Sequence, residues 1–441
     1  MTKSTHWFTR SLLVGLTLGA LGSFARAQAP AGTIYIESNL GSTEGMNSVV
    51  AFTRDGSGVL TKLGEYPTKG TGVHTNFTIP IPDGPTLNTG LGPFDSDQNL
   101  LLSPDGKRLF AVNCGSDTIA VFNVNADGSL VAVKGSPFKS FGKMPVSIGF
   151  AGPTKNILAV VNKDYDLGRA NFDVTKRAPN YTSFKIDAKG RLVRIPKSSI
   201  IAEEGGNKGL GYSNPTQALI SPDGKLMFDV DFFGYQIHSF AVLPNGRLQR
   251  DETQFTPVDE QGTFPPFAGL RALPVPLGMA VHPTQPIVYV GFVFDSRIGV
   301  YYYNAHGEMQ FLRSVPVGAG PCWVRVNTAG TRLYTSNTLS NSVSQLDLTD
   351  PYNPVSLAAD FTLTAAPADA MTRTGASPFG INLDPGGQYL HAITIKALQA
   401  QSDHANALHV LKLDANGKIT AETHREQFDD QPNAPQGITS R

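Results

Sequence analysis

Short apolar runs separated by tight turns recur along most of the chain. The clearest copy runs from Asn99 to Val131 (NLLLSPDGKRLFAVNCGSDTIAVFNVNADGSLV), where apolar and polar positions alternate. Alternation with a period of two is typical of half-buried β-strands and not of helices. The pattern therefore predicts short strands joined by hairpin turns.

Two sets of turns mark where these strands end. The first set lies at 103–106 (Ser-Pro-Asp-Gly), 152–155, 221–224, 282–285, 327–330 and 384–387. The second set lies at 125–128 (Asn-Ala-Asp-Gly), 187–190, 244–246, 304–307 and 414–417. Proline presets φ for a turn and glycine accepts a positive φ, so each site is expected to be a corner between two antiparallel strands.

Each repeat thus predicts a four-stranded antiparallel meander, which is the blade of a β-propeller. Six copies carry the first turn, and a seventh is split between the two ends of the chain. Residues 33–36, 48–53 and 59–66 supply its strands two to four, and residues 434–438 supply its first strand. Pairing of the two ends would close the ring and leave no bare edge strand. We therefore predict an all-β, seven-bladed propeller formed by residues 28–441 as one domain; two separate β-domains would not explain why the tail resembles a first strand.

The first 27 residues have the features of a secretory signal. Lys3 and Arg10 precede an apolar stretch at 11–24, and Ala25-Arg26-Ala27 fits a cleavage site with small residues. The alternative is a buried N-terminal helix. No later run approaches the roughly 18 apolar residues of a membrane-spanning helix. The sequence predicts a periplasmic or secreted protein without an integral membrane segment after cleavage.

Composition narrows the range of partners. The chain has 45 Gly and 31 Pro, which fits many turns and argues against long helices. It has 36 basic and 36 acidic residues and no basic run, so a nucleic-acid partner is not expected. Cys114 and Cys322 fall in blades that do not touch, which predicts two separate, half-buried thiols and not a disulfide. We expect a monomer.

The longest insertions all fall on one predicted face of the ring, here called the top face. It carries the loops between second and third strands and the links between blades. The insertions are Thr71–Gln98, Lys163–Asn180, Glu203–Asn214, Val258–Pro276 and Lys396–Asn406. Drift in unselected loops is one explanation. The other is a binding site for a small-molecule ligand at the mouth of the central channel, and we favour it.

Candidate chemistry comes from polar residues of this face, because no familiar catalytic or metal-binding motif is present. The candidate catalytic residues are Asp231, Lys163 and Arg297, and the candidate binding residues are Asp97, Gln98, Asp164, Gln217, Trp323, Arg325 and His404. A carboxylate beside Lys or Arg could activate water and polarise a carbonyl group. Exposed loops are polar in any case, which is the alternative for each residue. No cofactor and no metal ion are expected, because clustered ligands are missing.

Two stretches of the repeats resemble the lactonase-type seven-bladed propellers, the family of bacterial phosphogluconolactonase and fungal carboxymuconate lactonising enzymes. They are Leu100–Asn113 with Lys143–Ser147, and Gly320–Val324 with Leu333–Asn337. The stretches look closest to an exported, lactonase-like or carboxymuconate cyclase-like branch. This resemblance implies opening or closing of a lactone ring without a metal.

The chain departs from that family at most of its functional positions. Pro215-Thr216 stands where the family tends to have Pro-His, Pro276-Leu277-Gly278 where it has Pro-Arg-His, and Pro378-Phe379 where it has Pro-Arg. A family Glu corresponds to a position near Val293, and another to Trp323. Only Asp231 matches a family acid.

Two functions remain open from the sequence. One is a lactone hydrolase, with Asp231 as the base and Lys163 or Arg297 stabilising the oxyanion. The other is a non-catalytic propeller that binds a carbohydrate, a peptide or an envelope partner on its top face. The apolar replacements favour the second function, and the family resemblance favours the first.

Overall fold

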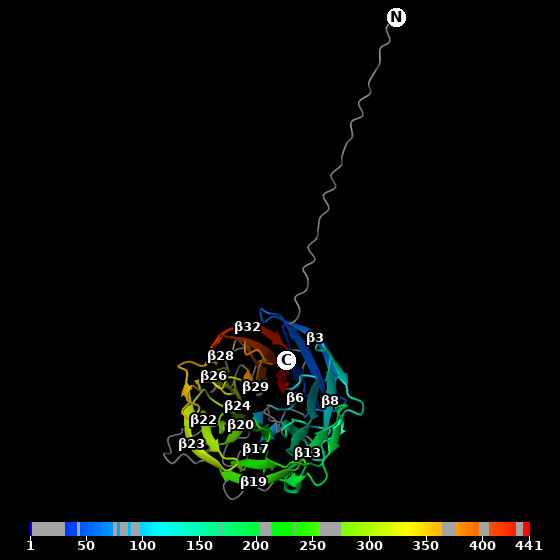
Figure 1. The fold of residues 1–441 in the computed structure, drawn as a ribbon, viewed down its shortest axis with the longest axis vertical. Helices are drawn as coiled ribbons and strands as arrows, with labels where there is room; N and C mark the ends of the chain where they lie inside the picture. The colour runs from blue at the N-terminus through cyan, green and yellow to red at the C-terminus, as the bar shows by residue number, and fades with distance from the viewer. Residues whose placement is uncertain are drawn as a thin grey trace.

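The fold was determined from a computed structural model. It describes Met1 and residues 31–41, 45–73, 77–79, 87–89, 98–166, 169–202, 213–232, 234–255, 275–363, 376–396, 405–428 and 435–441. Seven antiparallel sheets surround a common axis, as Figure 1 shows. Strands such as β6, β17, β20, β24 and β29 lie near the centre of that view, and β3, β19, β23 and β32 lie at the rim. The prediction of a seven-bladed, all-β propeller is confirmed.

We number the blades along the chain, starting with the split blade. Blade 1 contains β1 (Gly32–Glu37), β2 (Ser48–Arg54), β3 (Leu60–Pro67) and β33 (Ile438–Ser440). Blade 2 contains β6 (Leu100–Leu102), β7 (Arg108–Asn113), β8 (Thr118–Val124), β9 (Leu130–Ala132) and β10 (Phe138–Lys139). Blade 3 contains β11 (Pro145–Ala151), β12 (Ile157–Asn162), β13 (Asn180–Ile186), β14 (Leu192–Arg194) and β15 (Ile200–Ile201). Blade 4 contains β16 (Leu219–Ile220), β17 (Leu226–Asp231), β18 (Gln236–Val242) and β19 (Leu248–Phe255).

The remaining blades follow the same order. Blade 5 contains β20 (Pro276–Val281), β21 (Ile287–Phe292), β22 (Arg297–Tyr303) and β23 (Met309–Pro316). Blade 6 contains β24 (Pro321–Val326), β25 (Arg332–Asn337), β26 (Ser342–Asp347), β27 (Val355–Ser356) and β28 (Phe361–Thr362). Blade 7 contains β29 (Ser377–Leu383), β30 (Tyr389–Ile395), β31 (Ala407–Leu413) and β32 (Ile419–Gln427). Outside the ring of blades, β4 (Phe77–Ile79) pairs with β5 (Leu87–Thr89).

The outermost strand is interrupted in three blades. In blade 2, β9 and β10 both pair with β8. In blade 3, β14 and β15 both pair with β13, and in blade 6, β27 and β28 both pair with β26. In the described part of the chain the single helix is the short 3₁₀ helix η1 (Val174–Lys176). No helix found among those residues has the length and apolar character needed to cross a membrane.

The predicted corners form as expected. The amide of Gly106 donates to the carbonyl oxygen of Ser103 at 2.8 Å, and that of Gly128 donates to Asn125 at 3.0 Å. Gly128 has a φ of +92°, and a Cβ there would lie 2.6 Å from Thr33 Oγ1. Glycine is therefore needed at this corner both for its backbone conformation and for close packing against the neighbouring blade.

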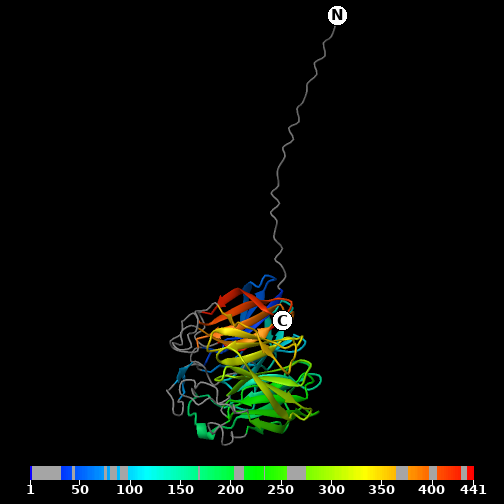
Figure 2. The same ribbon diagram turned by 90° about the vertical axis from the view of Figure 1, so that its left-hand side faces the viewer.

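The ring is closed by the two ends of the chain, as predicted. Ile36 lies opposite Ile438, and backbone hydrogen bonds continue the pairing to the amide of Arg441, which donates to Thr33 at 2.9 Å. The blue first blade lies beside the red end of the chain in Figure 2. The closing strand begins later than the predicted 434–438. Pro435 has no amide proton, and Gly437 has a φ of +82°, so regular strand geometry starts only at Ile438.

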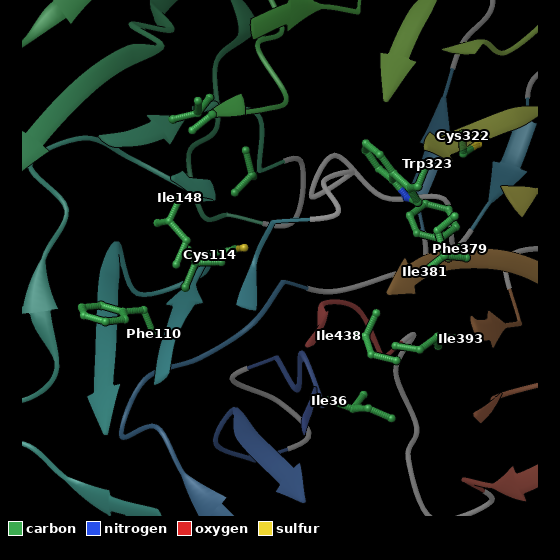
Figure 3. Close-up of a cluster of buried hydrophobic side chains, with 14 of the residues drawn as sticks. Ile36, Phe110, Cys114, Ile148, Cys322, Trp323, Phe379, Ile381, Ile393 and Ile438 are labelled. Atoms are coloured by element: carbon green, nitrogen blue, oxygen red, sulfur yellow. The ribbon is translucent and has the colours of Figure 1, made fainter. Parts of the chain in front are cut away.

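Buried side chains from many blades form the core between neighbouring sheets. Figure 3 shows part of the largest cluster, in which Trp323 and Phe379 lie together and Cys114 comes from a different blade than Cys322. Both cysteines are free, as predicted, but the expectation that they are half-buried is wrong, since Cys114 is 1% exposed and Cys322 is 3% exposed. Adjacent blades cover them: Cys114 Sγ donates to the carbonyl oxygen of Pro145 at 3.0 Å.

Closure leads to a stability prediction. Ile438→Ala should lower the free energy of unfolding by about 2–5 kcal/mol, because Ile438 is 1% exposed and its truncation leaves a cavity in the closing pair. Val355→Ala on β27, which is 62% exposed, should change it by less than about 0.5 kcal/mol. Urea denaturation of both variants checks this; equal effects would show that the closing pair does not limit stability.

Candidate functional site

The second strand of each blade ends on the top face, and several of these ends carry buried polar side chains. They are Glu37, Asn113, Asn162, Asp231 and Asn337. Each is at most 2% exposed. Alternation along a β-strand would allow an apolar residue at these positions, so buried polar groups here need partners or a ligand.

Asp231, the last residue of β17, is the candidate base. Its Oδ1 accepts hydrogen bonds from the amides of Asn214 at 2.6 Å and Gly234 at 2.8 Å. Its Oδ2 is buried and has no hydrogen-bond partner within the described residues. Burial raises the pKa of Asp231, while the nearby Ser213 hydroxyl, the amides of Asn214 and Gly234 and, last, the guanidinium of Arg177 oppose this rise. A carboxylate fixed by one oxygen, with the other oxygen unpaired, is suited to accept a proton.

Two residues beside Asp231 were not predicted. Ser213 and Asn214 lie on the segment that leads into β16, the inner strand of blade 4, and both are buried. Ser213 Oγ and Asn214 Oδ1, like Asp231 Oδ2, have no hydrogen-bond partner in the part of the chain that the structure describes. Three such atoms in one place indicate a position for a polar molecule, because buried polar groups are normally satisfied. Their one signal in the sequence is that they end the insertion at 203–214.

Cationic groups come from the insertion at 163–180. Lys163 is 1% exposed, and Asp164 Oδ2 accepts from the amide of Ala178 at 2.7 Å. Arg177, which was missed, donates from Nε to the carbonyl oxygen of Asp164 at 2.6 Å and from Nη2 to that of Lys163 at 2.9 Å. Its guanidinium also lies over the ring of Tyr165, 4.5 Å from the centroid. These contacts hold the charge of Arg177 on the top face within electrostatic reach of Asp231.

The other predicted residues of blades 5 and 6 lie in different surroundings. Arg297, at the start of the third strand of blade 5, donates from Nε to Ser314 Oγ at 2.7 Å and from Nη2 to the carbonyl oxygen of Ser314 at 2.9 Å on the outermost strand. Trp323 is fully buried, with its ring 5.9 Å from that of Phe379 and its Nε1 unpaired among the described residues. Arg325, on the same strand, donates from Nη1 to the carbonyl oxygen of Val324 at 3.0 Å.

Gln98 and Gln217 form a buried pair that links four inner strands. Gln217 Nε2 donates to Gln98 Oε1 at 2.8 Å and to the carbonyl oxygen of Met279 at 2.9 Å, and its Oε1 accepts from the Met279 amide at 2.7 Å. Gln98 Nε2 donates to the carbonyl oxygens of Ile148 at 2.9 Å and Ala218 at 3.0 Å. Both amides therefore cross-link blades 2 to 5, and a contact with substrate remains a prediction for them.

Two predicted binding residues, Asp97 and His404, lie outside the described residues, as do most of the insertions at 71–98, 203–214, 258–276 and 396–406. The described strands that flank these segments end on the top face. The site therefore consists here of the groups around Asp231, with Arg177 from blade 3. The charge of Lys163 acts on Cys114 of blade 2.

A second buried acid lies two residues before Asp231 on the same strand and was also missed. Asp229 Oδ1 accepts from the amides of Thr216 at 2.9 Å and Gln217 at 2.8 Å, and its Oδ2 lies 2.7 Å from Tyr181 Oη. Tyr181 Oη lies 3.0 Å from His238 Nδ1. Burial raises the pKa of Asp229 to about 8 and lowers that of His238 to about 3. At neutral pH both groups are therefore uncharged.

The chain is similar in sequence or in fold to several known proteins. No protein-family model matches the chain. The chain is 28% identical over 328 residues to the 6-phosphogluconolactonase of Photorhabdus laumondii, covering 73% of this chain and 83% of that protein. The periplasmic gluconolactonase of Pseudomonas aeruginosa has the same fold, with a TM-score of 0.65 at 13% identity over 93% of this chain and 98% of that one. A Bacteroides fragilis protein assigned as a 6-phosphogluconolactonase gives a TM-score of 0.65 at 15% identity, again over 93% and 98% of the two chains. The resemblance to the lactonase-type seven-bladed propellers is confirmed.

The glutamine pair allows a test of its role. Gln217→Ala should lower the free energy of unfolding by about 3 kcal/mol or more, because the amide and carbonyl of Met279 and the Oε1 of Gln98 lose the hydrogen bonds that Gln217 makes, at about 1–3 kcal/mol each. The exposed Gln310→Ala serves as the control. A loss below about 1 kcal/mol in chemical denaturation would contradict the cross-linking role.

Proposed function

We propose that this lactonase-like propeller hydrolyses a small lactone on its top face, with Asp231 as the general base. The observation that carries the proposal is the Asp231 carboxylate, which is held by two amides through Oδ1 while Oδ2 is buried without a partner. The likeness to a 6-phosphogluconolactonase supports a lactone as the substrate class.

In the proposed reaction, Asp231 Oδ2 takes a proton from water as the water oxygen attacks the lactone carbonyl carbon. The carbonyl oxygen becomes an oxyanion, which Arg177 or Lys163 stabilises. Collapse of this intermediate breaks the ring C–O bond, and the proton on Asp231 passes to the departing alkoxide oxygen. The products are one hydroxy acid and the regenerated carboxylate. No metal ion takes part in this sequence of steps.

The environment of Asp231 fits a base. Its burial raises the pKa, and a carboxylate with a raised pKa binds the proton of water more strongly during attack. The nearby Ser213 hydroxyl, the amides of Asn214 and Gly234 and the charge of Arg177 act in the opposite direction and favour the ionised form. Of the two cations first proposed for the oxyanion, we favour Lys163, since the guanidinium of Arg297 is bound to Ser314.

A non-catalytic propeller that binds a carbohydrate, a peptide or an envelope partner is the competing function. The apolar residues at the family's charged positions motivated it. Trp323 is fully buried against Phe379, so its ring is part of the core between blades and offers no stacking surface. This favours the hydrolase over a binding module built on Trp323.

The hydrolase is tested with a panel of γ- and δ-lactones followed by pH-stat. Asp231→Asn should lower kcat about 10²–10⁴-fold, because the amide keeps the acceptor oxygen but cannot take a proton. Asp223→Asn is the matched control, because Asp223 lies in the exposed corner that precedes β17, whereas Asp231 ends that strand. It should leave kcat unaltered. No turnover across the panel by a folded wild-type protein would refute the hydrolase and leave the binding function.

We also propose that the protein is exported to the periplasm or medium, which rests on the signal-like residues 1–27. That it is a monomer stays a prediction. The exported protein should have the mass of a chain that begins at Gln28. Ala27→Leu should leave the precursor uncleaved, because the cleavage site needs a small residue there. Intact-mass spectrometry checks this, and an exported chain that retains residues 1–27 would disprove cleavage at this site.

A further inference from the structure

A second group of buried polar side chains lies where blade 1 meets blade 2. Glu37 ends β1, Asn99 directly precedes β6, and Gln436 lies on the segment that leads into β33. Their exposed fractions are 2%, 3% and 1%. Glu37 Oε2, Asn99 Oδ1 and both polar atoms of the Gln436 side chain have no hydrogen-bond partner within the described residues. Because buried polar atoms are normally hydrogen-bonded, these four atoms indicate a place for a ligand.

Two sets of contacts bring Glu37 and Asn99 to the same corner. Through the backbone, the amide of Glu37 donates to the carbonyl oxygen of Gly437 at 3.1 Å, and a Cβ on Gly437 would lie 3.2 Å from Asn99 Cβ. Through side chains, Asn47 Nδ2 donates to Glu37 Oε1 at 2.6 Å and to the carbonyl oxygen of Val112 at 3.2 Å. The amide of Val112 in turn donates to the carbonyl oxygen of Asn99 at 3.0 Å. Glu37 and Asn99 therefore flank Gly437 from two neighbouring blades.

The closing segment brings Gln436 to the same corner. Gln436 directly precedes Gly437, and its amide donates to the carbonyl oxygen of Glu37 at 3.0 Å. Gly437 has a φ of +82°, and a Cβ there would lie 3.0 Å from the Cβ of Leu100. Glycine at this position therefore lets the end of the chain pass close to blade 2. Three segments that are far apart in the sequence thus meet here.

The carboxylate of this corner has no compensating charge. Burial raises the pKa of Glu37 and the hydrogen bond from Asn47 opposes the rise, while no basic side chain of the described residues takes part. A buried, unpaired carboxylate is costly. A proton on Glu37 Oε2 would not satisfy the site, because the resulting O–H would have no acceptor among the described residues. The occupant must therefore bring positive charge to a set of oxygen atoms.

We propose that Glu37, Asn99 and Gln436 bind one Ca²⁺ ion, which links the closing segment of the ring to blade 2. Carboxylate and amide oxygens are ligands that Ca²⁺ prefers, and water completes its shell of six to eight. The side-chain oxygens are Glu37 Oε2, Asn99 Oδ1 and Gln436 Oε1, and Gln436 Nε2 donates to one of the waters. Mg²⁺ fits less well, because it demands near-ideal octahedral geometry. A single carboxylate gives a dissociation constant of about 10⁻⁴–10⁻³ M.

The sequence gives no sign of this site. Two of its three side chains are amides, and the described residues contain no group of three or more His, Cys, Asp or Glu that could hold a metal ion. The site is separate from Asp231, since its residues belong to blades 1 and 2 and not to blade 4. It therefore does not rest on the proposed hydrolase.

Calorimetric titration of the whole protein with CaCl₂, after treatment with EDTA and dialysis, tests the proposal. The wild type should bind one Ca²⁺ per chain. Glu37→Gln should weaken binding at least tenfold, because it keeps an acceptor for Asn47 but removes the charge. Asn99→Ala should also weaken binding, and it carries the comparison if Glu37→Gln does not fold. Glu308→Gln, in an exposed corner of blade 5, is the matched control and should bind as the wild type does.

Thermal unfolding supplies a second measurement. A concentration of 10 mM CaCl₂, about 10–100 times the expected dissociation constant, should raise the Tm by roughly 1–4 °C over NaCl of equal ionic strength, and MgCl₂ should raise it less. Equal stabilisation by NaCl, no Ca²⁺ binding by the folded wild type, or unchanged binding by a folded Glu37→Gln protein would overturn the proposal. Neither measurement uses a lactone, so absence of turnover would refute the hydrolase and leave both results unaffected.

Discussion

The pairing of β1 with β33 is the interaction on which the rest of the structure depends. Each sheet of the ring buries both of its faces against neighbouring sheets, so no blade is complete without the blades on either side. An unclosed ring would leave the edge of β1 unpaired and the core between the first and last blades open to water. Backbone hydrogen bonds from Gln436 to Arg441 prevent this and hold the top-face residues of all seven blades in fixed positions.

The architecture could be predicted because its signals are local. Each corner is specified by a few residues such as Ser103–Gly106, and the strands between corners by alternation of apolar and polar residues. The start of the closing strand and the interrupted outer strands were less predictable. Pro435 and Gly437 delay the start of the closing strand. The interrupted outer strands are short segments at the rim, and their pairing depends on the neighbouring strand.

The site was predictable only in part, because it is built from residues far apart in the sequence. Asp231 was identified from its position after a second strand and its family match. Arg177, Ser213 and Asn214 lie in insertions that follow no repeat pattern, so only the fold shows that they approach Asp231. Tyr181 is 48 residues from Asp229 and 57 residues from His238 in the sequence, although its hydroxyl contacts both. Both read in the sequence as ordinary strand residues.

The Gln98–Gln217 pair makes the ring mechanically uneven around its axis. Near the centre, amide hydrogen bonds tie blades 2, 3, 4 and 5 into one arc. On the opposite side, apolar side chains such as Trp323, Phe379 and Ile438 pack near the axis. A side-chain hydrogen bond from Thr338 to Pro378 joins blade 6 to blade 7, and one from Asn382 to Ser440 joins blade 7 to blade 1. Apolar contacts are not directional and allow small sliding movements, whereas buried amide bonds resist them. We therefore expect small relative movements of blades 6, 7 and 1, while the arc of blades 2 to 5, which carries Asp231, keeps its shape.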